Sequence, residues 1–228
     1  MLSEVKQKLE NEIAEQKFFN ELEESIFDFN LIKIFQEDDN IYNLFGYVNE
    51  SKHFGLKTCF HADTKEFRIS KKFGLNEFCL TEFFTEDISK FIEILQSELK
   101  KLIDSIDKFD GDENFFVEQK QISKWKYSEN LPECLENFQL FMNPKKYLEV
   151  TNGSFVIINY CDFKIDSDLA IYYNIFSDNF GSEARINGAP TVIYDFDSDN
   201  LKELEEKLNN NLQIQLKNIR AEVQSQTN

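Results

Sequence analysis

The side chains best suited to metal chemistry lie near the end of the sequence, where acidic residues alternate in TVIYDFDSDNLKELEEKL (191–208). A calcium-binding EF-hand loop places oxygen ligands at positions 1, 3, 5 and 12 and a glycine at position 6. The four ligand positions are filled by Asp195, Asp197, Asp199 and Glu206. Position 6, however, is Asn200, and leucines at helical spacing begin inside the proposed loop. A helix here would carry Glu206 away from the aspartates, so calcium binding is the weaker of two interpretations.

The stronger interpretation of this stretch is a strand followed by a capped helix. TVIYDF (191–196) has the alternation of a strand, and Ser198, Asp199 or Asn200 can cap the helix that follows. With Glu203, Asn200 would form a capping box, in which the cap and the glutamate each accept a backbone N–H.

Two histidines and two cysteines supply ligand types that zinc prefers. They are His53, Cys59, His61 and Cys79. A Cys–x–His pair on a strand is not a chelating turn, and Cys59 and His61 share the less apolar face of their strand with Lys57. We therefore expect an exposed histidine beside a half-buried cysteine, and no metal or other cofactor.

The sequence contains none of the common catalytic motifs. Gly–x–Ser–x–Gly, a glycine-rich phosphate loop and His–Glu–x–x–His are all absent. A Cys–His pair from Cys59 or Cys79 is conceivable, but no motif fixes it. Carboxylate pairs for glycoside hydrolysis are not indicated, because acidic residues are too numerous for their spacing to be informative. We predict a protein without enzymatic activity.

The composition is that of a folded and strongly acidic protein. Hydrophobic residues make up 41% of the 228 residues and include 24 phenylalanines, whereas glycine (7) and proline (3) are scarce. Burying one phenylalanine stabilises the folded state by roughly 1.5–3 kcal/mol, so the chain can form a substantial core. The 25 basic and 42 acidic residues give a net charge of −17. A field of this sign repels nucleic acid and anionic membranes and attracts basic proteins.

The sequence also predicts a cytoplasmic location. The first residues, MLSEVKQKLENEI, lack the apolar core of a secretory signal, and no later run approaches the roughly 18 apolar residues of a transmembrane helix. The scattered cysteines, which we expect to be reduced, are Cys59, Cys79, Cys134 and Cys161.

Hydrophobic spacing predicts an α+β fold of two tandem, related units. Each unit is expected to be a roughly five-stranded antiparallel meander packed by a long amphipathic helix. In the first unit a helix runs to about residue 24, and a long helix begins after the cap Thr85. The strands of this unit are expected at 31–35, 41–48, 54–61, 66–70 and 77–84. In the second unit a helix at 131–142 is followed by strands at 147–150, 155–163, 169–176, 183–186 and 191–196, and by a final helix.

The repeated order of elements predicts an internal duplication of units spanning 1–108 and 131–228. Matching segments include EFRIS beside EARIN and FFTEDISKFIEIL beside DFDSDNLKELEEKL, although few residues are identical. A single continuous sheet is the alternative.

A polar connector, 109–130, lies between the two units and contains Phe115, Phe116, Trp125 and Tyr127. Four aromatic side chains indicate packing across the junction rather than a free linker. Trp125, the only tryptophan, could instead anchor a partner.

Acidic turns separate many of the predicted strands and form the expected partner-binding surface. Together with Trp125, the candidate partner-binding residues are Glu37, Asp38, Asp39, Asp162, Asp166, Asp168 and Asp178. A solvated rim explains any single acidic turn. As a set, the turns predict a surface that attracts a cationic partner and accelerates association.

We expect a non-enzymatic binding protein that neutralises a basic protein, such as an immunity protein that inhibits a toxin. A phage-type inhibitor that mimics nucleic acid, like an anti-CRISPR protein, is an alternative that would need carboxylates in rows at phosphate-like spacing. An acidic secretion chaperone is another, and it would need an exposed apolar groove and helices that dimerise. No direct binding of nucleic acid or membranes is expected.

Overall fold

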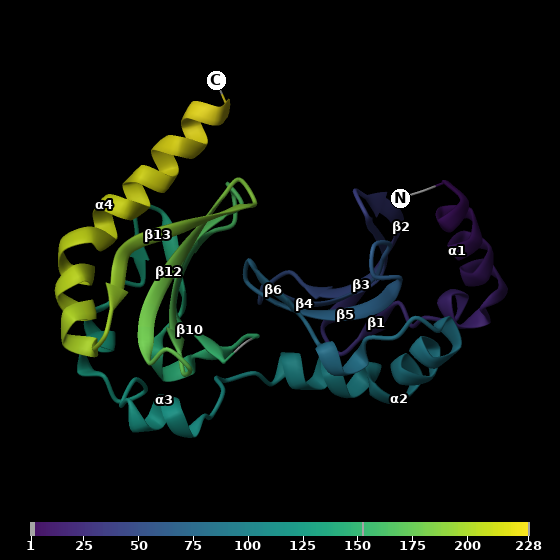
Figure 1. Ribbon diagram of the computed structural model, residues 1–228, viewed down its shortest axis with the longest axis horizontal. Helices are drawn as coiled ribbons and strands as arrows, with labels where there is room; N and C mark the ends of the chain where they lie inside the picture. The colour runs from purple at the N-terminus through teal and green to yellow at the C-terminus, as the bar shows by residue number, and fades with distance from the viewer. Residues whose placement is uncertain (1–2, 152, 228) are drawn as a thin grey trace. The chain divides into compact units, whose positions relative to one another are not determined.

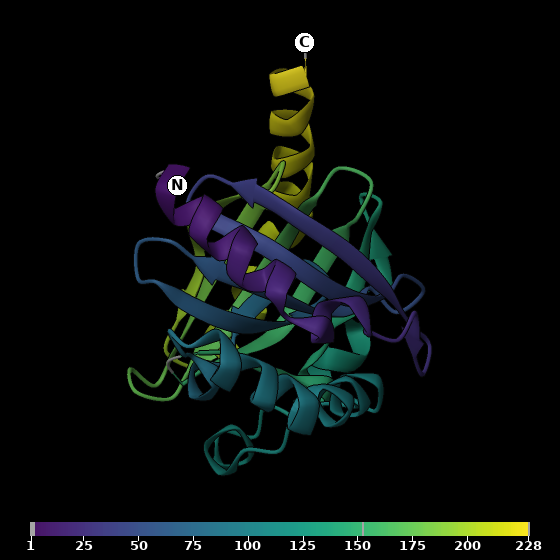
Figure 2. The same cartoon turned by 90° about the vertical axis from the view of Figure 1, so that its right-hand side faces the viewer.

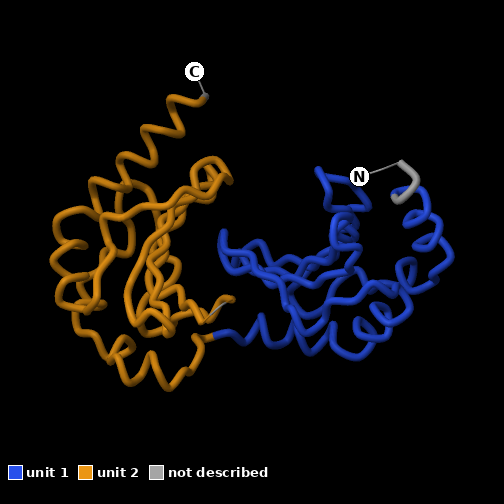
Figure 3. The backbone as a smooth tube through the Cα atoms, in the orientation of Figure 1, with its two compact units in different colours: residues 1–109 blue, residues 110–228 orange. Residues whose placement is uncertain are grey.

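The computed structural model describes residues 3–151 and 153–227. The chain divides into two compact units, residues 1–109 (unit 1) and residues 110–228 (unit 2), which Figure 3 colours separately. Each unit combines an antiparallel sheet with helices, so the predicted α+β class is confirmed. Residues 110–130, expected to form most of a connector, lie in unit 2.

In its described residues, unit 1 has a six-stranded antiparallel meander in the order β1-β2-β3-β4-β5-β6. The strands are β1 (Ser25–Ile26), β2 (Phe29–Asp38), β3 (Ile41–Asn49), β4 (Phe54–His61), β5 (Glu66–Phe73) and β6 (Asn76–Cys79). The helices are α1 (Ser3–Glu15) and α2 (Ile88–Asp107), with 3₁₀ turns η1 (Lys17–Asn20) and η2 (Thr81–Phe83).

The described part of unit 2 has a seven-stranded antiparallel sheet in the order β13-β12-β11-β10-β8-β7, with β9 also paired to β10. The strands are β7 (Cys134–Leu135), β8 (Phe138–Met142), β9 (Leu148–Glu149), β10 (Ser154–Asp162), β11 (Ser167–Asn174), β12 (Asn179–Ile186) and β13 (Ala189–Ser198). The helices are α3 (Phe115–Gln119) and α4 (Leu201–Thr227), with 3₁₀ turns η3 (Lys126–Asn130) and η4 (Pro144–Lys146).

In each unit a long helix packs on one face of the sheet (Figure 1). Phe91 of α2 stacks on Phe67 of β5, with ring centroids 5.0 Å apart. The rest of the buried stripe on α2 consists of Ile92, Leu95, Leu99, Ile103 and Ile106. In unit 2 a single core cluster joins the strands to the α4 residues Leu204, Leu208, Leu212, Leu216, Ile219 and Val223. These apolar stripes repeat every three or four residues, as a helix that covers a sheet requires.

Unit 1 carries a second helix, α1, which lies across the strands (Figure 2). Tyr42 of β3 is paired with Phe60 of β4, so its side chain points to the face that α2 covers. The Tyr42 hydroxyl donates to Glu10 Oε1 of α1 at 3.3 Å, and Leu9 and Ile13 of α1 are buried. Among the described residues, no helix has the length and apolar content needed to cross a membrane.

The structure corrects two predicted helices and one predicted cap. The first helix ends at Glu15, because η1 and the hairpin β1–β2 occupy the rest of the segment. Residues 131–142 contain the hairpin β7–β8. At its turn Glu136 and Asn137 have φ of 51° and 66°, the left-handed geometry of a type I′ turn, which overrides the helix-like apolar spacing. The cap of α2 is Asp87, whose side chain accepts from two backbone N–H groups, rather than Thr85.

All ten predicted strand segments overlap observed strands, and β1, β7 and β8 are additional. Corresponding elements of the two units begin at a constant separation along the chain. The same offset relates the first residues of β3 and β10 (41 and 154), of β4 and β11 (54 and 167), of β5 and β12 (66 and 179), and of α2 and α4 (88 and 201). The first strand of each set even has its bulge in the same place, between Asn43 and Phe45 in β3 and between Val156 and Ile158 in β10.

A buried tyrosine ties the first hairpin of each unit to its sheet. The hydroxyl of Tyr47 on β3 donates to the carbonyl of Glu23 at 2.8 Å. The hydroxyl of Tyr160 on β10 donates to the carbonyl of Pro132 at the same distance. Each accepting carbonyl lies just before the hairpin, so one interaction fixes the chain where it enters the sheet.

The C-terminal half of the long helix is joined to its unit by an ion pair, and the charges of this pair are reversed between the two units. In unit 1, Lys52 after β3 binds Asp107 at the end of α2, with Nζ 2.7 Å from Oδ1. In unit 2, Asp162 at the end of β10 binds Arg220 of α4, and the Arg220 Nε–H also donates to the carbonyl of Glu136 at 3.1 Å. Asp107 and Arg220 occupy corresponding positions, since the offset that relates α2 to α4 also relates these two residues.

Tyr160→Phe is expected to lower the free energy of unfolding of unit 2 by about 1 kcal/mol, because one buried hydrogen bond is lost. Trp125, the only tryptophan, lies in the unit 2 core, so its fluorescence during urea unfolding reports on this unit. Tyr194→Phe is the matched control, since Tyr194 is 74% exposed. An unchanged unfolding midpoint for Tyr160→Phe would contradict the assigned role of this hydroxyl.

Candidate functional site

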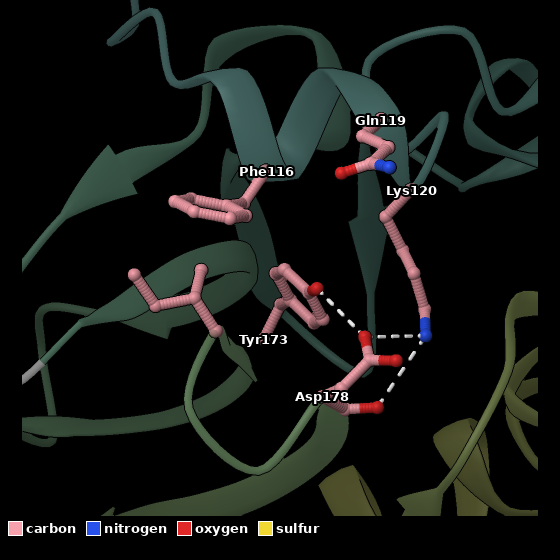
Figure 4. Close-up of a pocket in the computed structure, with 6 residues that line it drawn as sticks. Phe116, Gln119, Lys120, Tyr173 and Asp178 are labelled. Carbon is pink, nitrogen blue, oxygen red and sulfur yellow. Dashed lines mark hydrogen bonds and ion pairs between the residues drawn. The ribbon is translucent and has the colours of Figure 1, made fainter.

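A pocket of about 350 Å³ opens beside α3 in unit 2. Its lining residues, drawn in Figure 4, are Phe116, Gln119, Lys120, Tyr173, Ile175 and Asp178. They come from two places: α3 with the residue that follows it, and the last part of β11 with the turn that leads to β12. The geometry of the pocket therefore depends on how these two segments are held.

Local hydrogen bonds and one buried anchor fix α3. The side chain of Asn114 accepts from the Phe116 N–H at 3.0 Å and caps the helix. Val117 is fully buried in the unit 2 core. With Val117 facing inward on so short a helix, Phe115 and Phe116 remain 73% and 50% exposed.

The β11–β12 turn is held in the same way by an asparagine. Asn174 Oδ1 accepts from the backbone N–H groups of Phe176 and Ser177, at 2.9 and 3.1 Å. Asp178 follows with φ of 51°, a left-handed conformation that aspartate tolerates better than most residues. The result is a rigid turn that presents Phe176, 80% exposed, next to the pocket.

An ion pair and a tyrosine hydroxyl meet inside the pocket (Figure 4). Lys120 Nζ lies 2.6 Å from Asp178 Oδ1, and the Tyr173 hydroxyl donates to the same oxygen at 2.8 Å. These bonds, that from Lys120 first, hold the pKa of Asp178 below its usual range. Burial, and then the hydrogen bond to Asp178, raises the pKa of Tyr173 to about 12. At neutral pH the pocket therefore holds an ammonium, a carboxylate and a protonated phenol.

We define the α3 patch as the three exposed phenylalanines and this pocket. The phenylalanines are Phe115, Phe116 and Phe176. Asp112, Glu113 and Glu118 flank Phe115 and Phe116 along the chain, within α3 or just before it. Large exposed apolar groups beside charged residues are typical of protein-binding surfaces. The arrangement can bury aromatic side chains in the centre and meet positive charge around them.

Two of the predicted partner-binding aspartates are structural. Asp162 is 6% exposed and paired with Arg220. Asp168 is 3% exposed and accepts from the Asn159 amide at 3.0 Å, and burial raises its pKa. Both carboxylates are buried and contact neighbouring side chains within unit 2.

Trp125 is also placed in the unit 2 core, with 8% of its surface exposed. Its ring stacks on Tyr127 with centroids 5.1 Å apart, and its Nε1–H donates to Glu205 Oε2 at 3.3 Å. The four aromatic residues of the predicted connector thus divide into two kinds. Trp125 and Tyr127 pack against the unit 2 core, whereas Phe115 and Phe116 are exposed.

The remaining predicted aspartates and glutamate lie on separate turns. Glu37, Asp38 and Asp39 form the β2–β3 hairpin of unit 1, where Glu37 pairs with Lys6 at 3.2 Å. Asp166 directly precedes β11 and Asp178 lies in the turn after it, so this strand, at about 3.3 Å per residue, separates them by roughly 26 Å. Of the predicted residues, Asp178 is the one that belongs to the pocket.

The residues considered for zinc are distributed along the unit 1 sheet. His53 and His61 lie at opposite ends of β4, so they cannot share an ion. Burial, and then the neighbouring Cys79, raises the pKa of Cys59 to about 11, so this thiol is protonated at neutral pH. In residues 3–151 and 153–227, no three His, Cys, Asp or Glu side chains are grouped so that they could hold a metal ion.

The stretch considered for calcium is a strand and a capped helix, as the stronger interpretation predicted. Asn200 Oδ1 accepts from the Glu203 N–H at 3.0 Å, and Glu203 Oε2 accepts from the Asp199 N–H at 3.2 Å. The side chain of Asp195 accepts from Gln215 of α4. The first two bonds cap α4, and the third joins α4 to β13.

Sequence reasoning missed the exposed phenylalanines and Lys120. A usable signal was present at Asn114, a good cap followed by two consecutive phenylalanines. Neighbouring residues on a helix point in directions about 100° apart, so a single turn that buries Val117 cannot also bury both. No comparable signal marks Lys120, since only the fold brings it to Asp178.

Comparisons with known protein families, with curated proteins and with solved structures find no match.

Lys120→Gln is expected to raise the pKa of Asp178 toward the ordinary aspartate value of about 3.9, because the largest cause of its lowering is removed. Since the folded pKa lies below the unfolded one, this interaction stabilises the fold above the unfolded pKa and is lost as pH falls through the folded pKa. Carbon-13 NMR of the Asp178 carboxyl group over about pH 2–6 measures the change. Lys124→Gln removes the same charge from an exposed position and serves as the control. Equal pKa values in Lys120→Gln and the wild type would contradict the assignment.

Proposed function

We propose that the chain is a non-enzymatic acidic binding protein that neutralises a basic protein partner, in the way an immunity protein inhibits a toxin in the cytoplasm. The α3 patch is the proposed docking surface. The observation that carries the proposal is the exposure of Phe116, which lines a pocket that contains a carboxylate, together with that of Phe115 beside it and of Phe176 in the β11–β12 turn, at 50%, 73% and 80%.

The charge of the chain supports a basic partner. A net charge of −17 attracts a cationic protein over distances of about 10 Å, the screening length at 0.1 M salt, and speeds encounter. Charge alone gives little affinity once both surfaces are hydrated. The exposed phenylalanines supply the apolar contact that can make the complex last, as aromatic residues do at the centre of protein interfaces.

The state of the titratable groups supports a non-catalytic role. The pKa of Cys59 is raised to about 11 and that of Tyr173 to about 12, so both stay protonated at neutral pH. Lys120 is engaged as a cation with Asp178. A nucleophile or general base needs the opposite perturbation, with a pKa brought near the working pH.

We further propose that the two units arose by internal duplication. Support comes from the constant offset between corresponding elements, the shared bulge, and the tyrosine that ties each first hairpin. At the same offset, the unit 1 positions that correspond to Phe176 and Asp178 are Asp63 and Lys65. The α3 patch would thus be a feature of unit 2 added to a shared scaffold.

Peptides selected by phage display on the full-length chain are expected to carry net positive charge and at least one apolar residue. Phe116→Ala or Phe176→Ala should weaken the binding of such a peptide about tenfold or more, the usual cost of truncating a central aromatic contact. Phe27→Ala, at a 57% exposed position in unit 1, should leave binding unchanged. Biolayer interferometry at several salt concentrations measures both effects.

Two results would contradict the proposal. One is enrichment of peptides without net positive charge. The other is binding that is equally weakened by Phe27→Ala and Phe176→Ala. A basic peptide whose affinity does not fall as salt is raised would remove the electrostatic part of the argument.

A further inference from the structure

We propose that the pocket beside α3 is a receptor for a primary ammonium group. In the free chain this receptor is occupied by Lys120, and in the complex a lysine of the basic partner takes its place. The replacement of Lys120 by a partner lysine rests on the proposed function, whereas the receptor itself does not. Its support comes from the oxygens, the rings and the exposure of the ion pair.

Three oxygen atoms converge on the Lys120 ammonium. Asp178 Oδ1 lies 2.6 Å from Nζ, the Asp178 carbonyl oxygen 3.4 Å, and the Asp199 carbonyl oxygen 3.3 Å. An ammonium group has three N–H donors, so these acceptors match it one for one. A planar guanidinium would need acceptors arranged side by side, which makes lysine the better fit than arginine.

Two aromatic rings complete the receptor. Nζ of Lys120 lies 5.7 Å from the ring centroid of Tyr173 and 6.0 Å from that of Phe180, within the range of cation–π attraction. Tyr173 and Phe180 are 3% and 1% exposed, so the rings are fixed by the core. The Tyr173 hydroxyl also orients the Asp178 carboxylate through its hydrogen bond of 2.8 Å. The receptor is therefore preformed and does not depend on Lys120 for its shape.

The Lys120 ammonium group can be exchanged because its ion pair with Asp178 is weak. In this ion pair the side chains of Lys120 and Asp178 are 21% and 66% exposed, and an ion pair that contacts water changes an equilibrium constant by about fivefold at most. The backbone of Lys120 is fixed by its N–H bond to the Phe116 carbonyl at 2.9 Å. The long side chain can still swing away while α3 stays in place. Phe116 and Ile175, at the apolar side of the pocket, can then contact the methylene groups of an incoming lysine.

Lys120→Ala in the full-length chain should leave the receptor empty, and butylammonium chloride is the probe for it. We expect butylammonium to shift the ring resonances of Tyr173 and Phe180 saturably in Lys120→Ala, at concentrations about fivefold lower than in the wild type. Lys124→Ala should behave like the wild type, because its ammonium is exposed and its removal opens no site. Adding Asp178→Asn to Lys120→Ala should abolish the response. An equal response in wild type, Lys120→Ala and Lys124→Ala would overturn the receptor.

A measurement on the wild type keeps the proposal testable if Lys120→Ala fails to fold. The ammonium protons of Lys120, observed by nitrogen-15 NMR, should exchange with water more slowly than those of Lys124. Equal exchange rates would show that the pocket does not hold the ammonium group.

The partner step is tested with the selected basic peptides. They should bind Lys120→Ala about two- to fivefold more tightly than the wild type, and Lys124→Ala with unchanged affinity. If butylammonium binds Lys120→Ala but no basic peptide does, the receptor stands and the proposed function fails. If peptides bind through Phe116 and Phe176 while butylammonium does not bind, the proposed function stands and the receptor fails.

Discussion

The structure depends on the burial of one apolar sheet face in each unit beneath a long helix. Side chains alternate along an antiparallel strand, so a helix packed on one face of a sheet covers every second residue of a strand. Phe67 against Phe91 in unit 1, and the cluster beneath Leu204 and Leu208 in unit 2, are the contacts that satisfy this requirement. The proposed α3 patch is built from other segments, namely α3 and the end of β11 with the turn that follows.

The α3 patch combines short segments with residues of the core. Its rings and carboxylate come from a one-turn helix and a β-turn, each fixed by one asparagine side chain. Tyr173, which lines the pocket, and Phe180, whose ring lies near the Lys120 ammonium, both belong to the core. The buried rings set the geometry of the receptor, and the ion pair, which contacts water, can be replaced without disturbing the fold. Recognition needs both properties.

Much of the fold could be predicted from the sequence because alternation and helical stripes are local signals. They located ten strands and both long helices. The segment 131–142 was mistaken because its apolar residues fit a helix, while the decisive information lay in two turn residues, Glu136 and Asn137. The site was harder to predict because aspartates look alike in sequence. Asp162 and Asp178 differ only in tertiary partners, Arg220 for the first and Lys120 with Tyr173 for the second.

The ion pairs that hold α2 and α4 have reversed charges, and this affects how two similar units can form within one chain. Repeated units are prone to assemble with each other's parts, since their apolar surfaces resemble one another. With α4 placed on the unit 1 sheet, Arg220 would meet Lys52, and with α2 placed on the unit 2 sheet, Asp107 would meet Asp162. Both exchanges bring like charges together. In either exchange, repulsion between like charges would oppose placing a helix on the sheet of the other unit.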